Sequence, residues 1–432
     1  MKRPVIYTQT NISDDHIVVK LKVGFNLCNG ETFADGVNQL VETISYGGKG
    51  EFEAERTEAR EEYQVKVIGF DHDDSSLKEE EAIGRVHIAF PLKLCTGNLG
   101  IPQILSAVMY ASVYSFINEF QVTDITLPDA YLKHLPKPKY GTSIFSGDDS
   151  NLKIGLILKP RSIINATIAN EIVYKAGKAG VDYISDDELT IDPPEWPFKE
   201  RMPFIKNLLL ELKKDTGKDI KFIANISGSY ETSMKFAKIA EKNNVDGVMV
   251  NTITMGYDVV QTLAKNKQFK PFIVANVIGR NLMAGGTKYL VSDHIHSFFA
   301  RVSGADAVYT GPFVGTVKSR HEKASHFIWA LTDSLSKKYP VKPSYAVMSG
   351  GLEPKNLLQN WRIYSSPVMF SIGLNLCNLI EEGVPVTLVL NIIRTVFEAE
   401  KAGGADRVEK DITNLAASDK SYLQILTKLG WK

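Results

Sequence analysis

The first 145 residues alternate between strand-like and helix-like patterns of apolar positions. Alternating apolar and polar residues are typical of a half-buried strand, and apolar residues that recur every three or four positions are typical of a helix. The six segments run in the order β-α-β-β-α-β and comprise residues 16–25, 33–44, 63–70, 82–90, 101–116 and 122–132. This order is that of the ferredoxin-like split βαβ fold. We therefore predict a ferredoxin-like α+β domain over residues 1–145.

From Asn151 onward, a short apolar run and a helical pattern alternate eight times. The predicted strands are residues 152–158, 181–185, 220–225, 247–250, 271–277, 306–310, 344–348 and 368–372. Eight βα units over about 250 residues are typical of a (β/α)8 TIM barrel. The alternative, an open doubly wound sheet, needs a glycine-rich turn after its first strand, where this chain has Lys159, Pro160 and Arg161. We predict a barrel with a C-terminal helical extension over residues 146–432.

Composition narrows the class of protein. The chain has 50 basic and 50 acidic residues, so it has no excess positive charge of the kind that binds nucleic acid. Its three cysteines are scattered, which argues against disulfides and a zinc site and for a reducing compartment. The N-terminus has no apolar signal segment, and no run reaches the ~18 apolar residues of a membrane span. We predict a soluble, cytoplasmic protein without nucleic-acid or membrane partners.

Candidate chemistry follows from the barrel, because TIM barrels carry their catalytic groups where the strands end. Lys159 follows the first strand, and the second strand ends in Asp186, Asp187 and Glu188. Three adjacent carboxylates repel one another, so a fold that gathers them usually keeps a cation or a basic group nearby. Strand alternation turns Asp186 away from the mouth of the barrel. The alternative is a solvated acidic loop.

A glycine-containing turn follows the seventh strand. TIM barrels commonly bind phosphate with exposed backbone N–H groups after strands seven and eight. Ser349, Gly350 and Gly351 occupy the first of these two positions. The turn therefore indicates a phosphorylated ligand, although a plain turn has the same composition.

Two motifs resemble those of the ribulose-bisphosphate carboxylase (RuBisCO) large-chain family. Residues 155–161 (GLILKPR) resemble the family's GxTIKPK stretch, and residues 180–188 (GVDYISDDE) resemble its GxDFxKDDE stretch. Supporting matches are residues 97–98, 303–306, 310–311, 314–315 and 347–351. The likeness extends over nearly the whole chain. It is that of a form IV RuBisCO-like protein, a divergent and non-carboxylating member.

The resemblance implies roles for the residues at the barrel mouth. Lys159 matches the lysine that handles protons on the substrate enediol. Asp187 and Glu188 match two magnesium ligands. Glu42 and Asn98 match N-domain residues that reach the active site of a neighbouring subunit. The resemblance therefore implies a homodimer or an assembly of dimers.

The resemblance also implies a phosphate site. The matching positions are Ser349, Gly350, Gly351, Gly373 and Thr310. The implied ligand is a small phosphorylated sugar-like molecule.

Several positions depart from the carboxylase pattern, and four of them bear directly on the chemistry. Ser185 stands where the family has the lysine whose carbamate is the third metal ligand, and Thr316 replaces the lysine of the mobile loop. Asn276 and Tyr309 stand where the family has histidines. Without the carbamate and the loop lysine we expect no CO2 fixation. The loss of the carbamate also weakens the case for Mg2+ as a cofactor.

Three functions stay open at this point. The first is an enolase- or isomerase-type reaction on a phosphorylated ketose or sugar acid through an enediolate. The second is sugar-phosphate binding without turnover, with the acidic residues paired to Lys159 or Arg161. The third is a metal-independent lyase or decarboxylase reaction on a β-keto sugar acid phosphate.

Residues 293–296 (DHIH) resemble a metal-binding pair of histidines. If they formed the sixth strand, too few residues would separate it from the fifth strand for a helix and two loops. We therefore predict that His294 and His296 lie on the fifth barrel helix, in a structural or surface role.

Overall fold

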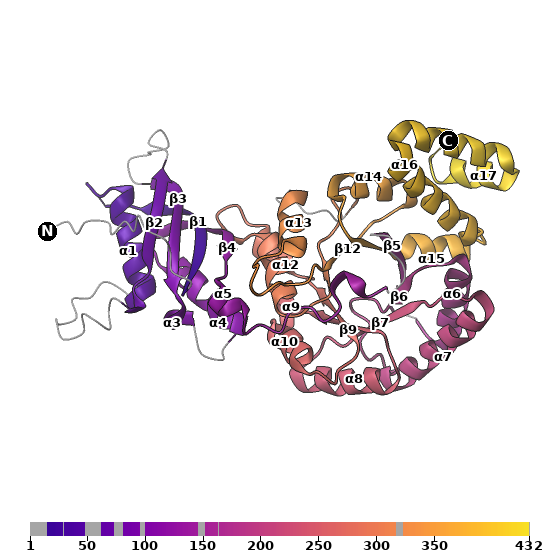
Figure 1. Cartoon of the computed structure of the whole chain (residues 1–432), viewed down its shortest axis with the longest axis horizontal. Helices are drawn as coiled ribbons and strands as arrows, with labels where there is room; N and C mark the ends of the chain where they lie inside the picture. Colours follow the sequence, from indigo (N-terminus) through magenta and orange to yellow (C-terminus); the bar gives the residue numbers. More distant parts are fainter. Residues whose placement is uncertain are drawn as a thin grey trace.

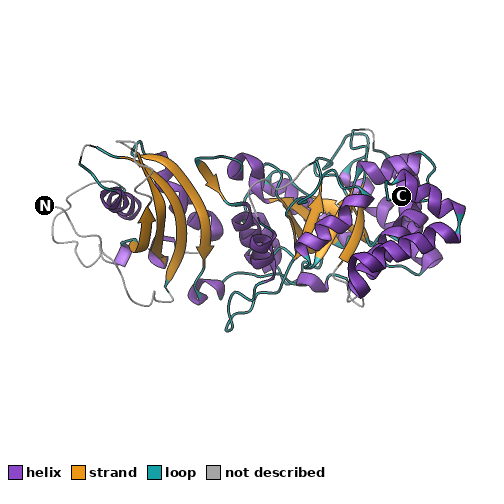
Figure 2. Ribbon diagram, turned by 90° about the horizontal axis from the view of Figure 1, so that it is seen from above, coloured by secondary structure: helices purple, strands orange, loops and turns teal. Residues whose placement is uncertain are grey.

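The computed structural model describes residues 15–28, 30–47, 62–72, 81–95, 100–145, 152–162, 164–316 and 323–431. An N-terminal sheet domain and a larger barrel lie side by side along the long axis of the molecule (Figure 1). The strands of the two parts form separate layers, with helices around both (Figure 2).

The N-terminal sheet has the ferredoxin-like strand order β4-β1-β3-β2, and all these neighbours are antiparallel. Its elements are β1 (His16–Asn26), α1 (Phe33–Tyr46), β2 (Lys66–His72), β3 (Glu81–Pro91), α3 (Leu92–Cys95), α4 (Gly100–Met109), η3 (Tyr110–Val113) and β4 (Ile117–Thr126). Helix α1 begins with a capping box between Thr32 and Asp35, and it buries Val37 and Leu40 against the sheet.

The last strand of this sheet lies earlier than its predicted position at 122–132. Strand β4 ends at Thr126, and the apolar residues that follow belong to the helical turn α5 (Asp129–Leu132). Polar residues such as Asn118 and Gln121 interrupt the apolar alternation at the start of β4, so the sequence pattern did not show it.

A fifth strand joins the sheet from the other part of the chain. Strand β10 (Tyr289–Val291) follows the fifth barrel strand and pairs in parallel with β4. Flanking hydrogen bonds extend the pairing, from Phe120 N to Lys288 O at 2.8 Å and from Ser292 N to Val122 O at 3.0 Å. This strand was not predicted, and it ties the N-terminal sheet to the barrel.

Eight parallel strands close the barrel in the order β11-β12-β13-β5-β6-β7-β8-β9. They are β5 (Leu152–Ile157), β6 (Tyr183–Ser185), β7 (Lys221–Asn225), β8 (Gly247–Asn251), β9 (Phe272–Asn276), β11 (Ala307–Tyr309), β12 (Tyr345–Ser349) and β13 (Val368–Ile372). Each lies within two residues of its predicted bounds, and the predicted TIM barrel is confirmed.

Helices surround the barrel and extend beyond it at the C-terminus. The main helices are α6 (Ala166–Ala179), α7 (Phe198–Thr216), α8 (Tyr230–Lys242), α10 (Asp258–Lys265), α12 (Asp293–Val302), α13 (Ala324–Thr332), α14 (Pro354–Tyr364), α15 (Leu374–Glu381), α16 (Val386–Ser418) and α17 (Lys420–Lys428). Two short helices, α9 (Thr252–Met255) and α11 (Arg280–Ala284), lie in the loops after β8 and β9. Among the described helices, none is both long and apolar enough for a bilayer.

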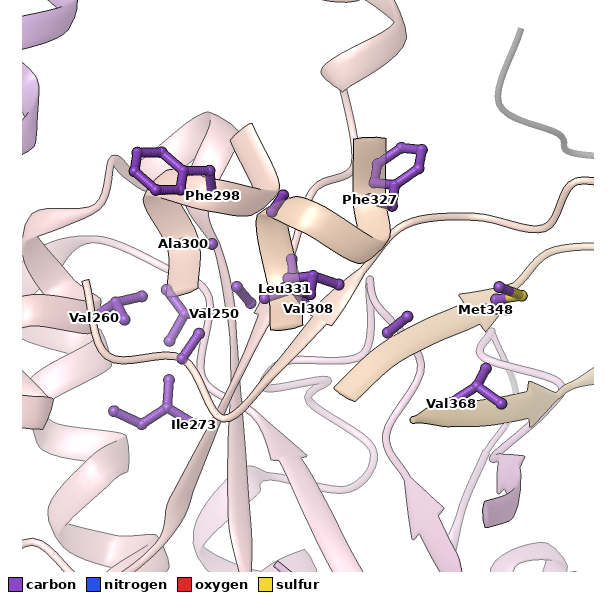
Figure 3. Close-up of a cluster of buried hydrophobic side chains, with 14 of the residues drawn as sticks. Val250, Val260, Ile273, Phe298, Ala300, Val308, Phe327, Leu331, Met348 and Val368 are labelled. Carbon is purple, nitrogen blue, oxygen red and sulfur yellow. The ribbon is translucent and has the colours of Figure 1, made fainter. Parts of the chain in front are cut away.

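The core fills the layer between strands and helices. Val250, Ile273 and Val308 from three strands lie near Phe298 of α12 and Leu331 of α13, and all five are buried (Figure 3). Burial of each such side chain contributes roughly 1.5–3 kcal/mol. This packing holds the strand ends, and therefore the loops at the mouth, in fixed positions.

Candidate active site

Lys159 and Asp187 meet at the mouth of the barrel. They follow the neighbouring strands β5 and β6, and the Lys159 ammonium forms an ion pair with the Asp187 carboxylate. The Asp187 side chain is fully buried, whereas Lys159 is 22% exposed and can be reached from the mouth. The other Asp187 oxygen, Oδ1, accepts a hydrogen bond from Leu189 N at 2.9 Å. Two contacts therefore hold the carboxylate that orients Lys159.

Glu188 shares this cluster. It is half-buried, and its carboxyl group interacts directly with that of Asp187. Burial and the neighbouring Asp187 raise the pKa of Glu188, whereas Lys159 lowers it. Two carboxylates therefore share one ammonium group, and the cluster keeps an excess of negative charge when both are ionised.

Asp186 belongs to a different environment. It is buried, and its Oδ1 lies 3.1 Å from Nε of Arg201 on α7. Its Oδ2 accepts hydrogen bonds from Arg201 Nη2 at 3.2 Å and from Asn225 N at 3.0 Å. Burial raises the pKa of Asp186, and Arg201 opposes that rise. The residue points away from the mouth and has a structural role.

Asn225 at the end of β7 fixes the backbone of the acidic segment. Its side-chain Nδ2 donates to the carbonyl oxygens of Asp187 at 3.1 Å and Glu188 at 2.7 Å. Its Oδ1 accepts from Ser227 N at 3.0 Å. Because the side chain is fully buried, these bonds are shielded from water and hold the two carboxylates in place.

Hydroxyl groups lie below the carboxylates inside the barrel. Tyr183 and Ser371 are 2.6 Å apart through their hydroxyl oxygens. Burial, together with the negative charge of Glu188, raises the pKa of the Tyr309 hydroxyl well above its usual value, so Tyr309 stays neutral. The Ser185 hydroxyl is buried and has no hydrogen-bond partner in the described part of the chain.

The donor set fits a magnesium ion held mainly by water and two carboxylates. Asp187 and Glu188 supply adjacent hard oxygens with excess negative charge, and the unpartnered Ser185 hydroxyl is a further oxygen. Over the described ranges, no group of three or more His, Cys, Asp and Glu side chains is placed to hold a metal ion. Any Mg2+ here would therefore have one anionic protein ligand fewer than in the carboxylase pattern.

The predicted phosphate turn lies at the end of β12. Gly350 and Gly351 have φ values of 105° and 65°, which favour glycine. A side chain on Gly351 would also collide with Thr316 of the loop after β11. Asn356 Nδ2 donates to the Gly351 carbonyl at 3.3 Å and helps to fix the turn. Ser349, Gly350 and Gly351 are all partly exposed, so a ligand can reach them.

The other two predicted phosphate residues, Gly373 and Thr310, differ in the groups that they contact. Gly373 follows β13 and lies close to Lys159, because a Cβ atom on Gly373 would lie 3.3 Å from the lysine Cε. The structure therefore brings Gly373 to the lysine. Thr310 is fully buried, and its hydroxyl donates to the carbonyl of Gly311 at 3.3 Å.

Arg280, which we did not single out in the sequence, lies in the loop after β9. It donates to the carbonyl oxygens of Tyr309, at 3.1 Å, and Thr310. Its Nε lies 3.6 Å from Asp293 Oδ2. The guanidinium thus satisfies the carbonyls at the end of β11. Its position after the fifth strand was the only signal in the sequence.

The two histidines of the DHIH segment are buried residues of α12, as predicted. His296 Nδ1 lies 2.9 Å from the Tyr257 hydroxyl oxygen. Burial lowers the pKa of His296 to about 4, so the ring is neutral at physiological pH. His294 packs against His326, with ring centroids 5.0 Å apart. The role of both residues is structural.

Of the two predicted N-domain residues, only Glu42 lies in the part of the chain that the structure describes. Glu42 is half-buried on α1, which lies on the side of the N-terminal sheet away from the barrel (Figure 1). Asn98 lies outside the described residues.

The strand-end geometry agrees with a comparison to known families. The model for the ribulose bisphosphate carboxylase large chain, catalytic domain, matches residues 139–373, which is more than half of the chain. The chain belongs to the RuBisCO large-chain family. The resemblance inferred from the motifs is thereby confirmed.

The family relatives include both enolases and carboxylases. A 2,3-diketo-5-methylthiopentyl-1-phosphate enolase of Geobacillus thermodenitrificans is 28% identical over 278 residues, which cover 62% of this chain and 64% of the relative. The chain thus aligns with slightly less than two thirds of that enolase. The Bacillus licheniformis enolase of the same name is 25% identical over 76% of this chain and 78% of its own. A ribulose bisphosphate carboxylase of Pyrococcus abyssi is 23% identical over an alignment that covers 66% of this chain and 68% of the relative.

Solved structures of the family share the fold. The dimeric archaeal Rubisco from Hyperthermus butylicus has a TM-score of 0.81 at 18% identity, and 99% of each chain is covered. A rubisco-like protein from Alicyclobacillus acidocaldarius has a TM-score of 0.76 at 19% identity, covering 92% of this chain and 98% of its own.

Proposed function

We propose that the chain is a non-carboxylating enzyme that enolises a phosphorylated ketose or a related phosphorylated ketone. The observation that carries this proposal is the partly exposed Lys159 ammonium, held by Asp187 beside Glu188 at the mouth of a RuBisCO-family barrel. The enolase relatives support the same type of reaction.

The proposed reaction begins when Lys159 takes a proton from the carbon next to the substrate carbonyl. Lys159 must first release its own proton, and because its ammonium is partly exposed at the mouth, that proton can leave to solvent. Backbone N–H groups of residues 349–351 and of Gly373 bind the substrate phosphate. Asp187 and Glu188 would hold Mg2+, which when bound supplies positive charge for the enediolate oxygen.

The exchange of substrate protons with solvent tests this proposal. The full chain is incubated in D2O with 2,3-diketo-5-methylthiopentyl 1-phosphate or ribulose 1,5-bisphosphate, and loss of the C–H signal is followed by NMR. We expect exchange on at least one phosphorylated ketone, and a loss of at least about 100-fold in Lys159→Met, the size typical of a removed general base. Lys175→Met is the control, because Lys175 is an exposed lysine paired to Glu171 on α6. Equal exchange rates in the two variants would refute the role of Lys159.

Carboxylation is not part of the proposed function. Ser185 cannot form a carbamate, and Thr316 has no charge to steady a new carboxylate. We expect no incorporation of labelled bicarbonate into ribulose 1,5-bisphosphate. Measurable incorporation would refute this.

We propose further that the site is completed by a second copy of the chain, as a homodimer or an assembly of dimers. Helix α1, which carries Glu42, lies on the side of the N-terminal sheet away from the barrel (Figure 1). We therefore expect Glu42 to reach a barrel mouth only on a partner. Mixing two variants tests this. Lys159→Met and Glu42→Gln are each expected to lose activity, whereas a mixed dimer has one site that carries neither change. Absence of recovered activity after verified subunit exchange would contradict the shared site.

A second candidate function is sugar-phosphate binding without turnover. The direct ion pair between Lys159 and Asp187 favours it, because this pair neutralises the lysine without any substrate. A rise in melting temperature with a phosphorylated ketose, together with no proton exchange, would support this alternative. The β-keto acid lyase alternative is tested in parallel by release of CO2 from a β-keto sugar acid phosphate.

A further inference from the structure

A cavity lies outside the barrel mouth, among the C-terminal helices. It has a volume of about 480 Å3 and is lined by residues of α14, of α16, of the loop after β11 and of the segment that follows α17. Small-molecule sites typically have volumes of about 300–1,000 Å3. The proposed reaction uses none of its wall residues.

The wall of this cavity is apolar on one side and cationic on the other. Leu358 and Val408 are buried in the wall, and Ile412 is partly buried. Lys355 and Arg362 also line the cavity, and no acidic residue of the described ranges does. Such a wall complements a molecule with an apolar body and one negative charge.

The two cations are only partly committed to other groups. Lys355 Nζ lies 3.0 Å from Glu353, but both side chains are about half exposed, and such surface pairs are weak. Arg362 uses Nε and Nη2 for Glu400, and Nη1 has no hydrogen-bond partner in the described part of the chain. Lys355 can therefore contribute charge to a ligand in the cavity, and Arg362 can contribute a hydrogen bond from Nη1.

Trp431 adds an aromatic surface to this wall. The residue lines the cavity and is partly exposed. Its indole Nε1 is buried and has no hydrogen-bond partner among the described residues, so this atom faces protein and not the open space of the cavity. The indole ring therefore contributes apolar surface for the body of a ligand.

We infer that this cavity binds a small amphipathic anion, with a carboxylate, sulfonate or phosphate group near Lys355 and Arg362 and an apolar body against Leu358, Val408 and Ile412. The site is separate from the barrel mouth but borders it. Asn356 lines the cavity and also donates to the Gly351 carbonyl of the proposed phosphate turn. The inference does not depend on the proposed function.

Gln359 allows a charge test that leaves the fold intact. It lines the cavity and is exposed, so either sign of charge is accommodated at its position. The probe is 8-anilinonaphthalene-1-sulfonate, an aromatic sulfonate, titrated into the full chain by fluorescence. We expect one site per chain, about fivefold weaker binding in Gln359→Glu and tighter binding in Gln359→Lys, as expected for one partly exposed charge.

Matched controls separate charge from general surface effects. Gln268→Glu makes the same change at an exposed residue before β9, and it should leave the affinity unchanged. N-phenyl-1-naphthylamine, which lacks the sulfonate, should bind both Gln359 variants alike. Ile412→Trp should fill the cavity and weaken both probes. If both Gln359 variants bind the sulfonate with the affinity of the original chain, or if Ile412→Trp leaves both probes unaffected, the inference is overturned.

Discussion

The buried pair between Asp186 and Arg201 gives the sharpest stability prediction. We consider Arg201→Met, which keeps most of the length and apolar volume of the side chain but removes its charge. Both partners are almost completely buried. The change therefore leaves a carboxylate in the interior with the Asn225 N–H as its remaining hydrogen-bond donor among the described residues.

The magnitude follows from the contacts that are lost. Besides Asp186, Arg201 donates to the carbonyl oxygens of Ile191 at 2.7 Å and Trp196 at 3.0 Å. Removal of one partner from a buried ion pair typically costs about 3–5 kcal/mol. The two carbonyls add to this cost, and the apolar methionine offsets part of it, so we expect about 4 kcal/mol. If the barrel unfolds as one unit of about 290 residues, this lowers its melting temperature by roughly 7 °C.

The loss should also depend on pH. Burial raises the pKa of Asp186 and Arg201 lowers it, so the pKa rises further when Arg201 is removed. A carboxyl group with a raised folded-state pKa binds more protons in the native state than in the unfolded state. Its destabilising effect therefore decreases as pH falls toward its ordinary pKa near 3.8. The deficit of Arg201→Met should thus be smaller at pH 5 than at pH 8.

Thermal unfolding at the two pH values is the assay, with circular dichroism as the signal. The double variant Asp186→Asn/Arg201→Met removes the uncompensated charge and should recover part of the loss. Lys175→Met breaks an exposed pair and should change stability by less than about 1 kcal/mol. A deficit below about 1 kcal/mol for Arg201→Met, or one that grows toward pH 5, would refute the reasoning.

Three further predictions concern the surroundings of the mouth. Gly311→Ala should lower the free energy of unfolding by about 1–3 kcal/mol, because φ is 73° and the new Cβ would collide with Arg280. Gly217→Ala is the control, since Gly217 has a φ of 71° but open space around it. Equal losses of stability in thermal unfolding of the two variants would contradict the collision. His296 should lower the free energy of unfolding by about 3 kcal/mol in total as pH falls from 6.5 to about 4, because its ring is protonated in the unfolded chain but stays neutral when buried. His296→Gln should make the stability less dependent on pH over this range. Ser185→Lys should strengthen Mg2+ binding in calorimetry by about tenfold when bicarbonate is present, since a carbamate adds an anionic ligand, and unchanged binding would contradict that arrangement.

The barrel strands were predictable because each is a short apolar run between helical patterns. All six residues of β5 are buried, and all but Lys153 are apolar or glycine, which makes the strand visible in the sequence. Strand β10 lacks this signal. It has three residues, Tyr289 is 46% exposed, and its partner β4 lies about 170 positions earlier in the chain. Such a pairing depends on how the two parts of the chain meet, which no local pattern records.

The candidate site was predictable where position along a strand determines direction. Lys159, Asp187 and Gly373 each follow a barrel strand closely, and parallel strands of a barrel all end at the same mouth. Arg201 and Arg280 could not be found in the same way. A guanidinium reaches several ångströms from its backbone, so its sequence position says little about the carbonyl or carboxylate that it contacts.

The three consecutive carboxylates show how one residue of register separates stability from chemistry. Asp186 points toward α7, where Arg201 neutralises it in the interior. Asp187 points toward Lys159, and Glu188 shares that single ammonium. Removal of the Asp186 charge leaves Arg201 without its counter-ion in the interior, away from Lys159, and therefore acts mainly on folding. Removal of the Asp187 charge frees Lys159 and relieves the repulsion on Glu188. We therefore expect Asp186→Asn to lose stability and Asp187→Asn to lose proton exchange on the substrate. The reverse result would place the catalytic cluster around Arg201 instead.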